Sequence, residues 1–316
     1  MEILRRGARL RVPRRWSTIA RMSNPANASA VAPAERRVVV APDVGLHVEV
    51  RSGEPAAAPV VLVHGLASNL RLWDGVAERL HADGHTVVAI DQRGHGRSDA
   101  PDAGYDLDTA VADLLALIEA LGLERPLLAG QSWGGSVVLE LAWRNPGAVR
   151  GIVCVDGGVT DMSQSYPLWG DCLAKLTPPT LTHLTLGELE KRIRAGVPHF
   201  SDRAVAAYLH CFRERPDGKI EPRLARDRHL MILRSLWEYR PSARWATLKV
   251  PTLLLLAGND DEARMANKRR AEAKALAAGG PIRSVWFTPG HHDLHLESPD
   301  RVADLLLQGL RDGFFE

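Results

Sequence analysis

A serine placed to act as a nucleophile stands at the centre of a Gly-x-Ser-x-Gly segment, residues 130–134, with Ser132 in the middle. The segment follows the short apolar run Leu127–Ala129 and opens a helical pattern at Trp133–Arg144. A strand-to-helix turn this tight needs glycines on either side of the serine, because side chains there would clash, and the turn lifts the hydroxyl clear of the sheet. Free N–H groups at the start of the helix favour developing negative charge. The spacing therefore predicts that Ser132 attacks a carbonyl carbon.

Two backbone N–H groups are needed to hold the oxyanion that such an attack creates. One is expected from Trp133, the residue after the nucleophile, and the other from Leu66, in the loop after the apolar run Val60–Val63. His64 lies in the same loop and is a candidate base. A histidine in such a turn more often braces the backbone by hydrogen bonding, and we favour that interpretation.

A carboxylate and an imidazole that could activate the serine occur in two later loops. The apolar run Leu253–Ala257 leads into residues 258–261, which end with two aspartates. The run Ser284–Phe287 leads into residues 288–297, which contain three histidines. We expect the acid in the first loop and the base in the second.

The histidine-rich stretch could also suggest a metal site. However, His291, His292, Asp293 and His295 lack the spacing of a closed zinc site, and no cysteine lies nearby. The chain also has no glycine-rich fingerprint for a dinucleotide or a phosphate. We therefore expect neither a metal nor a cofactor.

The segment Asp-Gln-Arg-Gly-His-Gly-Arg-Ser, residues 91–98, follows the apolar run Val87–Ile90. Its glycines suit a tight turn, and we interpret the segment as structural. Asp91 and Arg93 are expected to hold neighbouring loops together.

The pattern of apolar runs indicates the scaffold that positions these residues. Continuous apolar runs separated by helical patterns imply a sheet covered on both faces, with parallel strands and crossover helices. Ser298 can cap the last helix, which has Pro299 at its first position. We therefore expect the α/β class, with a mostly parallel, doubly wound sheet. The expected strands are Arg37–Ala41, Leu46–Arg51, Val60–Val63, Val87–Ile90, Leu127–Ala129, Ile152–Val155, Leu253–Ala257 and Ser284–Phe287.

Residues 157–246 interrupt this alternation with several prolines and with helical stretches such as Leu186–Ala195 and Asp202–Phe212. We expect them to form a helical lid inserted into a core made of residues 36–156 and 247–316.

The first 22 residues carry seven arginines and one acid, a local charge of +6 in a chain with a net charge of +2. Such a leader has the composition of a transit peptide or of a disordered basic arm, and Met22 suggests a later start. We exclude residues 1–35 from the fold as a disordered extension. The remainder is mildly acidic, so we expect no nucleic-acid partner.

The chain has three cysteines, Cys154, Cys172 and Cys211, and their odd number and wide spacing argue against a disulfide framework. No apolar run approaches the length of a membrane span. We therefore expect a cytoplasmic protein without a membrane span that acts on a small molecule. The oligomeric state stays open.

Together, the motifs resemble those of serine hydrolases in the α/β-hydrolase superfamily, over roughly residues 37–156 and 247–316. The turn around Ser132, the His-Gly loop, the segment at 91–98 and the closing Gly-His…His-Leu-Glu-x-Pro stretch carry the resemblance. The lid resembles the family only in its position. The resemblance implies the chain order Ser, Asp, His for the catalytic residues.

The resemblance also selects one acid and one histidine. In relatives the acid usually comes last in a Gly-x-x-Asp turn, which implies Asp261. Asp156, at the end of an earlier strand, is the main rival, and Asp260 is another. The catalytic histidine typically lies five residues before the Glu of the His-Leu-Glu-x-Pro stretch, which implies His292, with His291 as the close rival.

The implied activity is the hydrolysis of a carboxylic ester of a small, largely apolar substrate through an acyl-enzyme. Ser132, in place of an aspartate, disfavours a dehalogenase or an epoxide hydrolase. Carbon–carbon bond hydrolysis, amide or peptide hydrolysis and acyl transfer are alternatives, as is a non-enzymatic binder of small molecules on the same fold. Some aromatic residues of the lid are expected to line the acyl pocket, and most to hold the lid together: Tyr166, Trp169, Tyr208, Phe212, Trp237, Tyr239 and Trp245.

Overall fold

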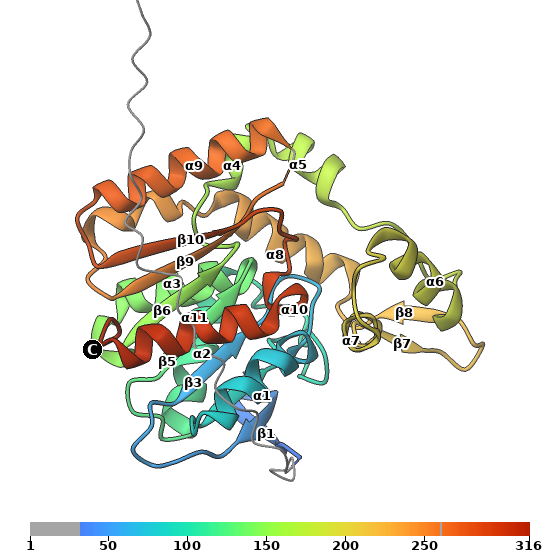
Figure 1. Cartoon of the computed structure of the whole chain (residues 1–316). Helices are drawn as coiled ribbons and strands as arrows, with labels where there is room; N and C mark the ends of the chain where they lie inside the picture. Colours follow the sequence, from blue (N-terminus) through green and yellow to red (C-terminus); the bar gives the residue numbers. More distant parts are fainter. Residues whose placement is uncertain (1–31, 260) are drawn as a thin grey trace, which may run out of the picture. The chain divides into compact units, whose positions relative to one another are not determined.

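One sheet of eight strands forms the centre of the computed structural model, which describes residues 32–259 and 261–316 (Figure 1). The strands are β1 (Ala34–Ala41), β2 (Val44–Arg51), β3 (Val60–Val63), β4 (Val87–Ile90), β5 (Leu127–Gln131), β6 (Gly151–Val155), β9 (Thr252–Ala257) and β10 (Ile282–Phe287). They lie side by side in the order β1-β2-β4-β3-β5-β6-β9-β10. Spatial order and chain order differ because helices cross over between parallel strands.

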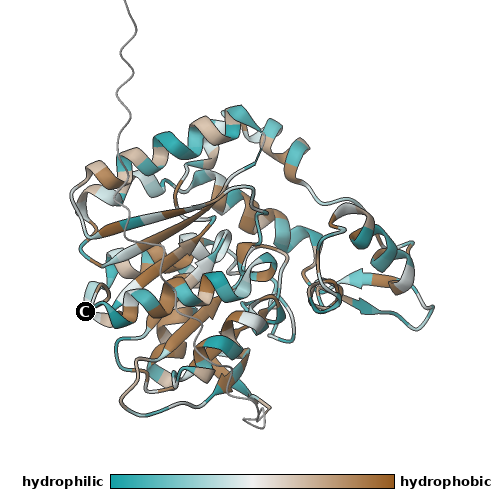
Figure 2. Cartoon of the chain, in the orientation of Figure 1, coloured by the Kyte–Doolittle hydropathy of each residue, from teal (hydrophilic) through white to brown (hydrophobic). Residues whose placement is uncertain are grey.

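The sheet is mostly parallel. All pairs among β3, β4, β5, β6, β9 and β10 are parallel, whereas β2 pairs antiparallel with β1 and with β4. Every residue of β3, β4, β5, β6 and β9 is buried. Figure 2 shows these central strands as a largely hydrophobic layer. The predicted α/β class with a mostly parallel sheet is confirmed, since continuous apolar strands fit a sheet covered on both faces.

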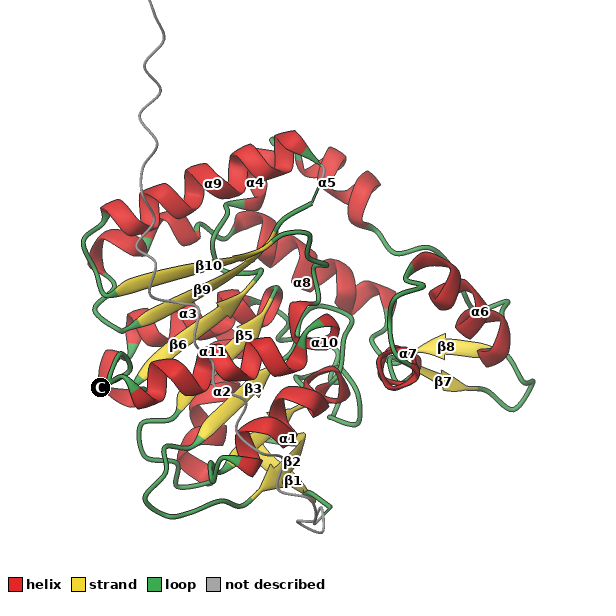
Figure 3. Cartoon of the chain, in the orientation of Figure 1, coloured by secondary structure: helices red, strands yellow, loops and turns green. Residues whose placement is uncertain are grey.

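Helices cover both faces of the sheet (Figure 3). On one face, Leu62 and Val153 of the strands share a buried cluster with α1, α10 and α11. On the other face, Val61 and Leu128 share a cluster with α2, α3, α8 and the end of α9. The helices are α1 (Asp74–Ala82), α2 (Leu107–Ala120), α3 (Trp133–Arg144), α8 (Arg226–Glu238), α9 (Glu262–Ala277), α10 (Leu294–Glu297) and α11 (Pro299–Arg311).

The segment between β6 and β9 contains more than helices. It holds α4 (Met162–Ser165), α5 (Trp169–Leu176), α6 (Leu186–Gly196) and α7 (Asp202–Leu209), and also a two-stranded sheet of β7 (Phe212–Glu214) and β8 (Ile220–Pro222). Figure 3 shows this strand pair apart from the main sheet. The expected helix Asp202–Phe212 is shorter in the structure: it ends at Leu209, and Phe212 begins β7. A Pro-Asp-Gly turn at residues 216–218, with Gly218 at φ 74°, folds the chain back into the hairpin.

Two boundaries differ from the sequence expectations. β1 begins at Ala34, inside the extension predicted for residues 1–35, because residues 34 and 35 pair with Val50 and Glu49 of β2. Residues 1–31 lie outside the described part of the chain. Ser298 precedes α11 but makes no side-chain capping bond, since its backbone (φ −134°, ψ 57°) is not in the usual capping conformation.

Two further observations bear on the sequence expectations. None of the helices in the described ranges is both long and apolar enough to cross a membrane. All three cysteines, Cys154, Cys172 and Cys211, are free thiols.

Candidate functional site

Ser132 lies on a strained turn between β5 and α3. Its backbone has φ 51° and ψ −112°, a conformation that is costly for a residue with a side chain. A Cβ at Gly130 would lie 2.2 Å from the carbonyl oxygen of Gly134, and one at Gly134 would lie 2.4 Å from that of Val63. The turn therefore requires both glycines, as the sequence predicted, and it leaves Ser132 half-buried.

The end of β6 lies beside this turn because β5 and β6 are neighbours, with Gln131 paired to Val155. The Ser132 N–H donates to the Val155 carbonyl oxygen at 3.0 Å. A Cβ at Gly157 would lie 2.1 Å from the Ser132 carbonyl oxygen. Asp156, between Val155 and Gly157, is therefore held next to the serine.

Asp156 and His292 form a hydrogen bond of the kind that orients a catalytic base. The His292 Nδ1 lies 2.7 Å from Asp156 Oδ2. The other carboxylate oxygen, Oδ1, accepts from the Ala257 N–H at 3.0 Å and from Lys268 Nζ at 2.5 Å. The side chain of Asp156 is 1% exposed and that of His292 is 39% exposed. A buried carboxylate thus holds a histidine that solvent can reach.

The Asp156 carboxylate is ionised at neutral pH. Burial by itself would raise the pKa of Asp156, but the hydrogen bonds and positive charges of His292 and Lys268 outweigh burial and hold the pKa to about 2. An ionised carboxylate at this position can stabilise a protonated imidazole.

The expected acid, Asp261, is not paired with His292 in the structure and has to be corrected. Asp261 is an exposed residue at the N-cap of α9, where its Oδ1 accepts from the Arg264 N–H at 2.9 Å. Asp261 follows β9, which is separated from β5 by β6, whereas Asp156 follows β6 itself. The carboxylate that meets His292 thus comes from the end of β6, the strand beside β5, and not from the end of β9. Asp260, the other alternative, lies outside the described residues.

Of the two neighbouring histidines, the structure places His292 against the carboxylate. The His291 N–H donates to Glu297 Oε2 at 2.8 Å, and its Nδ1 accepts from the Asp293 N–H at 3.1 Å. The side-chain amide of Gln131 donates to the His292 carbonyl oxygen at 3.3 Å. The loop that carries His292 is therefore tied to the serine turn.

The loop after β3 packs against the serine. A Cβ at Gly65 would lie 3.1 Å from the Cβ of Ser132. No hydrogen bond from the N–H of Leu66 or of Trp133 is found among the residues that the structure describes. These two predicted donors are thus positioned in the loop and at the first turn of α3 without a competing protein acceptor.

Two buried histidines brace this loop. His64 Nε2 accepts from the Gln92 N–H at 3.0 Å, so its Nδ1 carries the proton and donates to the Gly65 carbonyl oxygen at 2.7 Å. His95 Nε2 accepts from the Ala67 N–H at 3.1 Å. Burial lowers the pKa of His64 and lowers that of His95 to about 3. The prediction that His64 braces the turn is confirmed.

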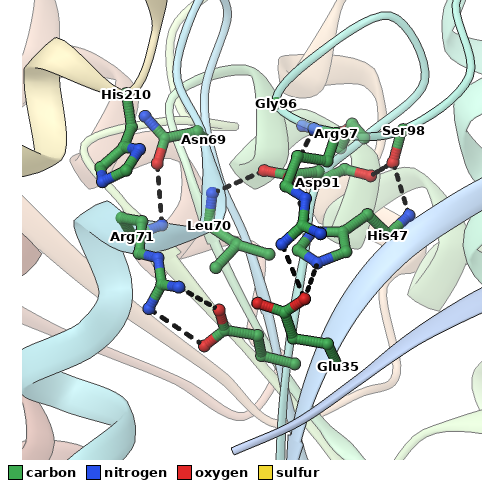
Figure 4. Close-up of polar contacts among 12 residues, drawn as sticks. Glu35, His47, Asn69, Leu70, Arg71, Asp91, Gly96, Arg97, Ser98 and His210 are labelled. Carbon is green, nitrogen blue, oxygen red and sulfur yellow. Dashed lines mark hydrogen bonds and ion pairs between the residues drawn. The ribbon is translucent and has the colours of Figure 1, made fainter.

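Asp91, the residue after β4, joins β2 to the segments that carry Leu70 and Arg97 (Figure 4). Its buried carboxylate makes three contacts of 2.9 Å, with the Leu70 N–H, the Arg97 N–H and His47 Nδ1. Arg93 donates to both carboxylate oxygens of Asp113, at 2.8 and 2.7 Å. The prediction that Asp91 and Arg93 hold loops together is confirmed.

The inserted segment reaches the site through α7. The Tyr208 hydroxyl hydrogen-bonds to the carboxylate of Asp293, the residue after His292. The side-chain amide of Asn69 donates to the Ala207 carbonyl oxygen at 2.9 Å. These contacts attach α7 both to the histidine loop and to the segment that follows β3.

Several lid aromatics have structural contacts. Tyr239 and Trp245 belong to the buried core cluster. Trp169 packs against Trp237, with ring centroids 5.8 Å apart.

A cavity of about 20 Å³ lies beside Trp133, and it has room for about one water molecule. This cavity is therefore too small for an acyl chain.

Within residues 32–259 and 261–316, no group of three or more His, Cys, Asp or Glu side chains could hold a metal ion.

Two side chains at the site, Gln131 and Lys268, were not predicted from the sequence. Lys268 occupies an inward position of α9 three residues after the buried Met265, and it is itself buried. That spacing was the one available signal, because a lysine on a buried stripe is unusual.

Comparisons with known proteins agree with this architecture. The family described as "Alpha/beta hydrolase family" matches the chain over residues 60–305. A 2-(acetamidomethylene)succinate hydrolase of Mesorhizobium japonicum is 34% identical over 158 residues, which cover 49% of this chain and 49% of that protein. The chain thus spans about half the length of this curated relative.

Two solved structures show the same fold. The crystal structure of E-2-(acetamidomethylene)succinate hydrolase has a TM-score of 0.68 and 21% identity, and covers 87% of this chain and 98% of its own. A thioesterase domain from the curacin biosynthetic pathway has a TM-score of 0.72 and 20% identity, and covers 88% of this chain and 100% of its own. Because the family match covers more than half of the sequence, this chain belongs to the alpha/beta hydrolase family.

Proposed function

We propose that the protein is a serine hydrolase that cleaves a carboxylic ester or a related acyl bond of a small, largely apolar substrate. Ser132 is the nucleophile, His292 the general base and Asp156 the carboxylate that orients His292. The observation that carries the proposal is the 2.7 Å contact between His292 Nδ1 and the buried Asp156, at the strand end beside the strained serine turn.

The geometry supports acyl transfer in two stages. With Nδ1 donating to Asp156, His292 Nε2 is free to accept the proton of Ser132 as its Oγ attacks the carbonyl carbon. The N–H groups of Leu66 and Trp133 hold the oxyanion. The imidazolium gives its proton to the leaving alcohol, which leaves an acyl-enzyme. Water then attacks the acyl carbon while His292 takes its proton. The imidazolium returns that proton to Ser132 Oγ as the acid departs, which restores the free enzyme.

The names of the relatives support this choice among serine-dependent reactions. One relative is named as a hydrolase of 2-(acetamidomethylene)succinate, and one structural neighbour is named as a thioesterase domain. The thioesterase name describes cleavage of an acyl bond, which fits the free oxyanion donors. Carbon–carbon bond hydrolysis, acyl transfer and ligand binding without catalysis are the alternatives that experiments must distinguish from ester cleavage.

A fluorophosphonate probe tests the nucleophile. The folded protein is expected to react covalently at one site, and Ser132→Ala is expected to abolish the reaction, because loss of the serine in such a unit costs on the order of 10⁶ in kcat. Peptide mapping of the labelled protein checks the site. A folded wild-type protein that does not react at all would contradict the proposal and favour a non-enzymatic binder.

A matched pair of variants tests the acid. Asp156→Asn is expected to slow labelling about 10³- to 10⁴-fold, because an amide at this position stabilises the wrong imidazole tautomer. Asp261→Asn makes the same chemical change at an exposed helix cap and is expected to stay within about threefold of wild type. Asp260→Asn completes the comparison. If Asp260→Asn or Asp261→Asn shows the large loss and Asp156→Asn the small one, the acid lies after β9.

The bond that is cleaved is tested with p-nitrophenyl esters of increasing acyl length. Hydrolysis that depends on both Ser132 and chain length is expected. If the protein labels at Ser132 but hydrolyses none of these esters, ester cleavage is wrong, and carbon–carbon cleavage or acyl transfer by the same residues takes its place.

A further inference from the structure

A buried lysine occupies the side of the Asp156 carboxylate opposite to His292. Lys268 lies on α9, is 8% exposed, and donates from Nζ to Asp156 Oδ1 at 2.5 Å and to the Ala257 carbonyl oxygen at 2.8 Å. Lysine is almost never buried to this degree unless it is paired. Burial lowers the pKa of Lys268, and the charge of Asp156 opposes that shift. The 2.5 Å distance between Nζ and Asp156 Oδ1 is that of an ion pair.

The two oxygens of the carboxylate have separate partners. Oδ1 accepts from Lys268 and from the Ala257 N–H, whereas His292 is the only one of the described residues within hydrogen-bond distance of Oδ2. Rotation of the carboxylate would break both bonds to Oδ1. The bonds on Oδ1 therefore aim Oδ2 at the imidazole, as supporting hydrogen bonds do in other preorganised sites.

We propose that Lys268 is a positioning residue that holds Asp156 ionised and in one rotamer, so that its Oδ2 orients His292. The inference rests on the proposed function, because it assigns Lys268 a part in preparing the catalytic base. Lys268 acts through Asp156 and makes no contact with His292 among the described hydrogen bonds.

The charge of Lys268 also affects the proton on His292. A positive charge beside Asp156 offsets part of the attraction that the carboxylate exerts on an imidazolium. Removal of that charge is therefore expected to strengthen the hold of the Asp156–His292 pair on its proton. The other charged or titratable groups that face the pair are Arg264, 4.0 Å from Asp156 Oδ2, and His291, Asp293 and His295 on the histidine loop.

The test is an NMR titration of the His292 imidazole, assigned by its loss in His292→Gln. Lys268→Met removes the charge at similar length and is expected to raise the midpoint by about 0.5 to 1 pH unit. Lys268→Arg keeps the charge and is expected to stay within about 0.3 unit of wild type. Lys274→Met is the matched control, because Lys274 is exposed on the same helix. The titration needs no catalysis, so it tests Lys268 even if the proposed function fails.

Labelling by the fluorophosphonate probe gives a second readout. Lys268→Met is expected to slow labelling at pH 7 at least tenfold and to shift its pH profile upward, and Lys268→Arg to restore most of the rate. A folded Lys268→Met protein whose titration and pH profile match those of Lys274→Met overturns the inference.

A double variant covers the case in which Lys268→Met does not fold, since it leaves a buried carboxylate unpaired. Asp156→Asn/Lys268→Met removes both charges and is expected to be at least as stable as Asp156→Asn/Lys274→Met. In the Asp156→Asn background, loss of Lys268 should slow probe labelling no further, because the carboxylate that Lys268 positions is already absent. A further loss as large as the one that Lys268→Met causes alone would show that Lys268 does not act through Asp156, and would overturn the inference.

Discussion

Asp156 uses its two carboxylate oxygens for different tasks, one bonded to Lys268 and the backbone and one to His292. Its backbone lies at φ 44°, and that of Ser132 at φ 51°. Such conformations cost of order 1–3 kcal/mol for residues with side chains and persist where the surroundings over-determine them. Both strained residues stand at the ends of adjacent strands, and they are the residues proposed as the nucleophile and the acid.

At this scale, the two adjacent histidines are expected to respond differently to the same substitution. His292→Gln removes the proposed base and should slow probe labelling by about 10³-fold or more. His291→Gln should stay within about tenfold of wild type, because the His291 N–H bond to Glu297 comes from the backbone and survives. Labelling rates at pH 8 measure both. Equal losses would show that the proposed assignment of the base to His292 is not specific.

At the scale of elements, the site depends on how closely β5 and β6 approach. The chain after β6 passes so near the serine turn that it tolerates no side chain at Gly157, where a Cβ would lie 2.1 Å from the Ser132 carbonyl oxygen. Gly135 in α3 is restricted in a similar way, because a Cβ there would lie 2.8 Å from the Gly157 backbone. Backbone contacts of this kind set the positions of Ser132 and Asp156 relative to each other.

Gly157→Ala is therefore expected to destabilise the protein by about 1–3 kcal/mol and to slow labelling, because the added methyl pushes the two strand ends apart. Gly187→Ala is the matched control, since a Cβ there meets nothing within 4 Å in α6 and should stabilise the helix by up to about 1 kcal/mol. Urea unfolding and probe labelling measure the two effects. A Gly157→Ala protein with wild-type stability and labelling would show that the close packing of Gly157 against the Ser132 turn affects neither property.

At the scale of the whole molecule, buried neutral histidines make stability depend on pH. Burial lowers the pKa of His95 to about 3 and that of His295 to about 4. The unfolded chain, with histidine pKa values near 6.5, therefore binds more protons below about pH 6.5. Stability should accordingly fall as the pH drops from about 6.5 towards 4. Asp156 contributes in a separate window, since its lowered pKa matters only below about pH 4.

Each of these two histidines is expected to lower the free energy of unfolding by about 1.4 kcal/mol for each unit that the pH falls within that window. Urea unfolding at pH 7.5, 6 and 5 measures the slope. His295→Leu should reduce the slope of the unfolding free energy against pH by the contribution of one histidine, whatever the variant's stability at pH 7.5. His183→Gln changes an exposed histidine and should leave this slope unchanged. An unaltered slope in His295→Leu would show that His295 does not stay neutral in the folded protein.

The sequence by itself determined the features whose causes are local. Apolar runs predicted β3 and β4 with their observed bounds, because a strand buried on both faces must be apolar throughout. The glycines around Ser132 predicted the turn, and the clash that Gly130 avoids, with the carbonyl oxygen of Gly134, lies within five residues of chain. The clash that Gly134 avoids is instead with Val63, at the end of the neighbouring strand β3. The brace at His64 and the structural segment at 91–98 were also predicted from single loops.

Tertiary structure decided what depends on neighbours that are distant in the chain. The partner of His292 is Asp156, 136 residues earlier at the end of β6, even though β9 is the direct neighbour of the strand β10 that leads to His292. Sequence order does not distinguish the two strand ends, because an aspartate at either one satisfies the same motif. The contact of Lys268 with Asp156 spans 112 residues and depends on how α9 rotates against the sheet. Strand order and helix rotation are set by packing across the whole core, so neither can be read from the segments alone.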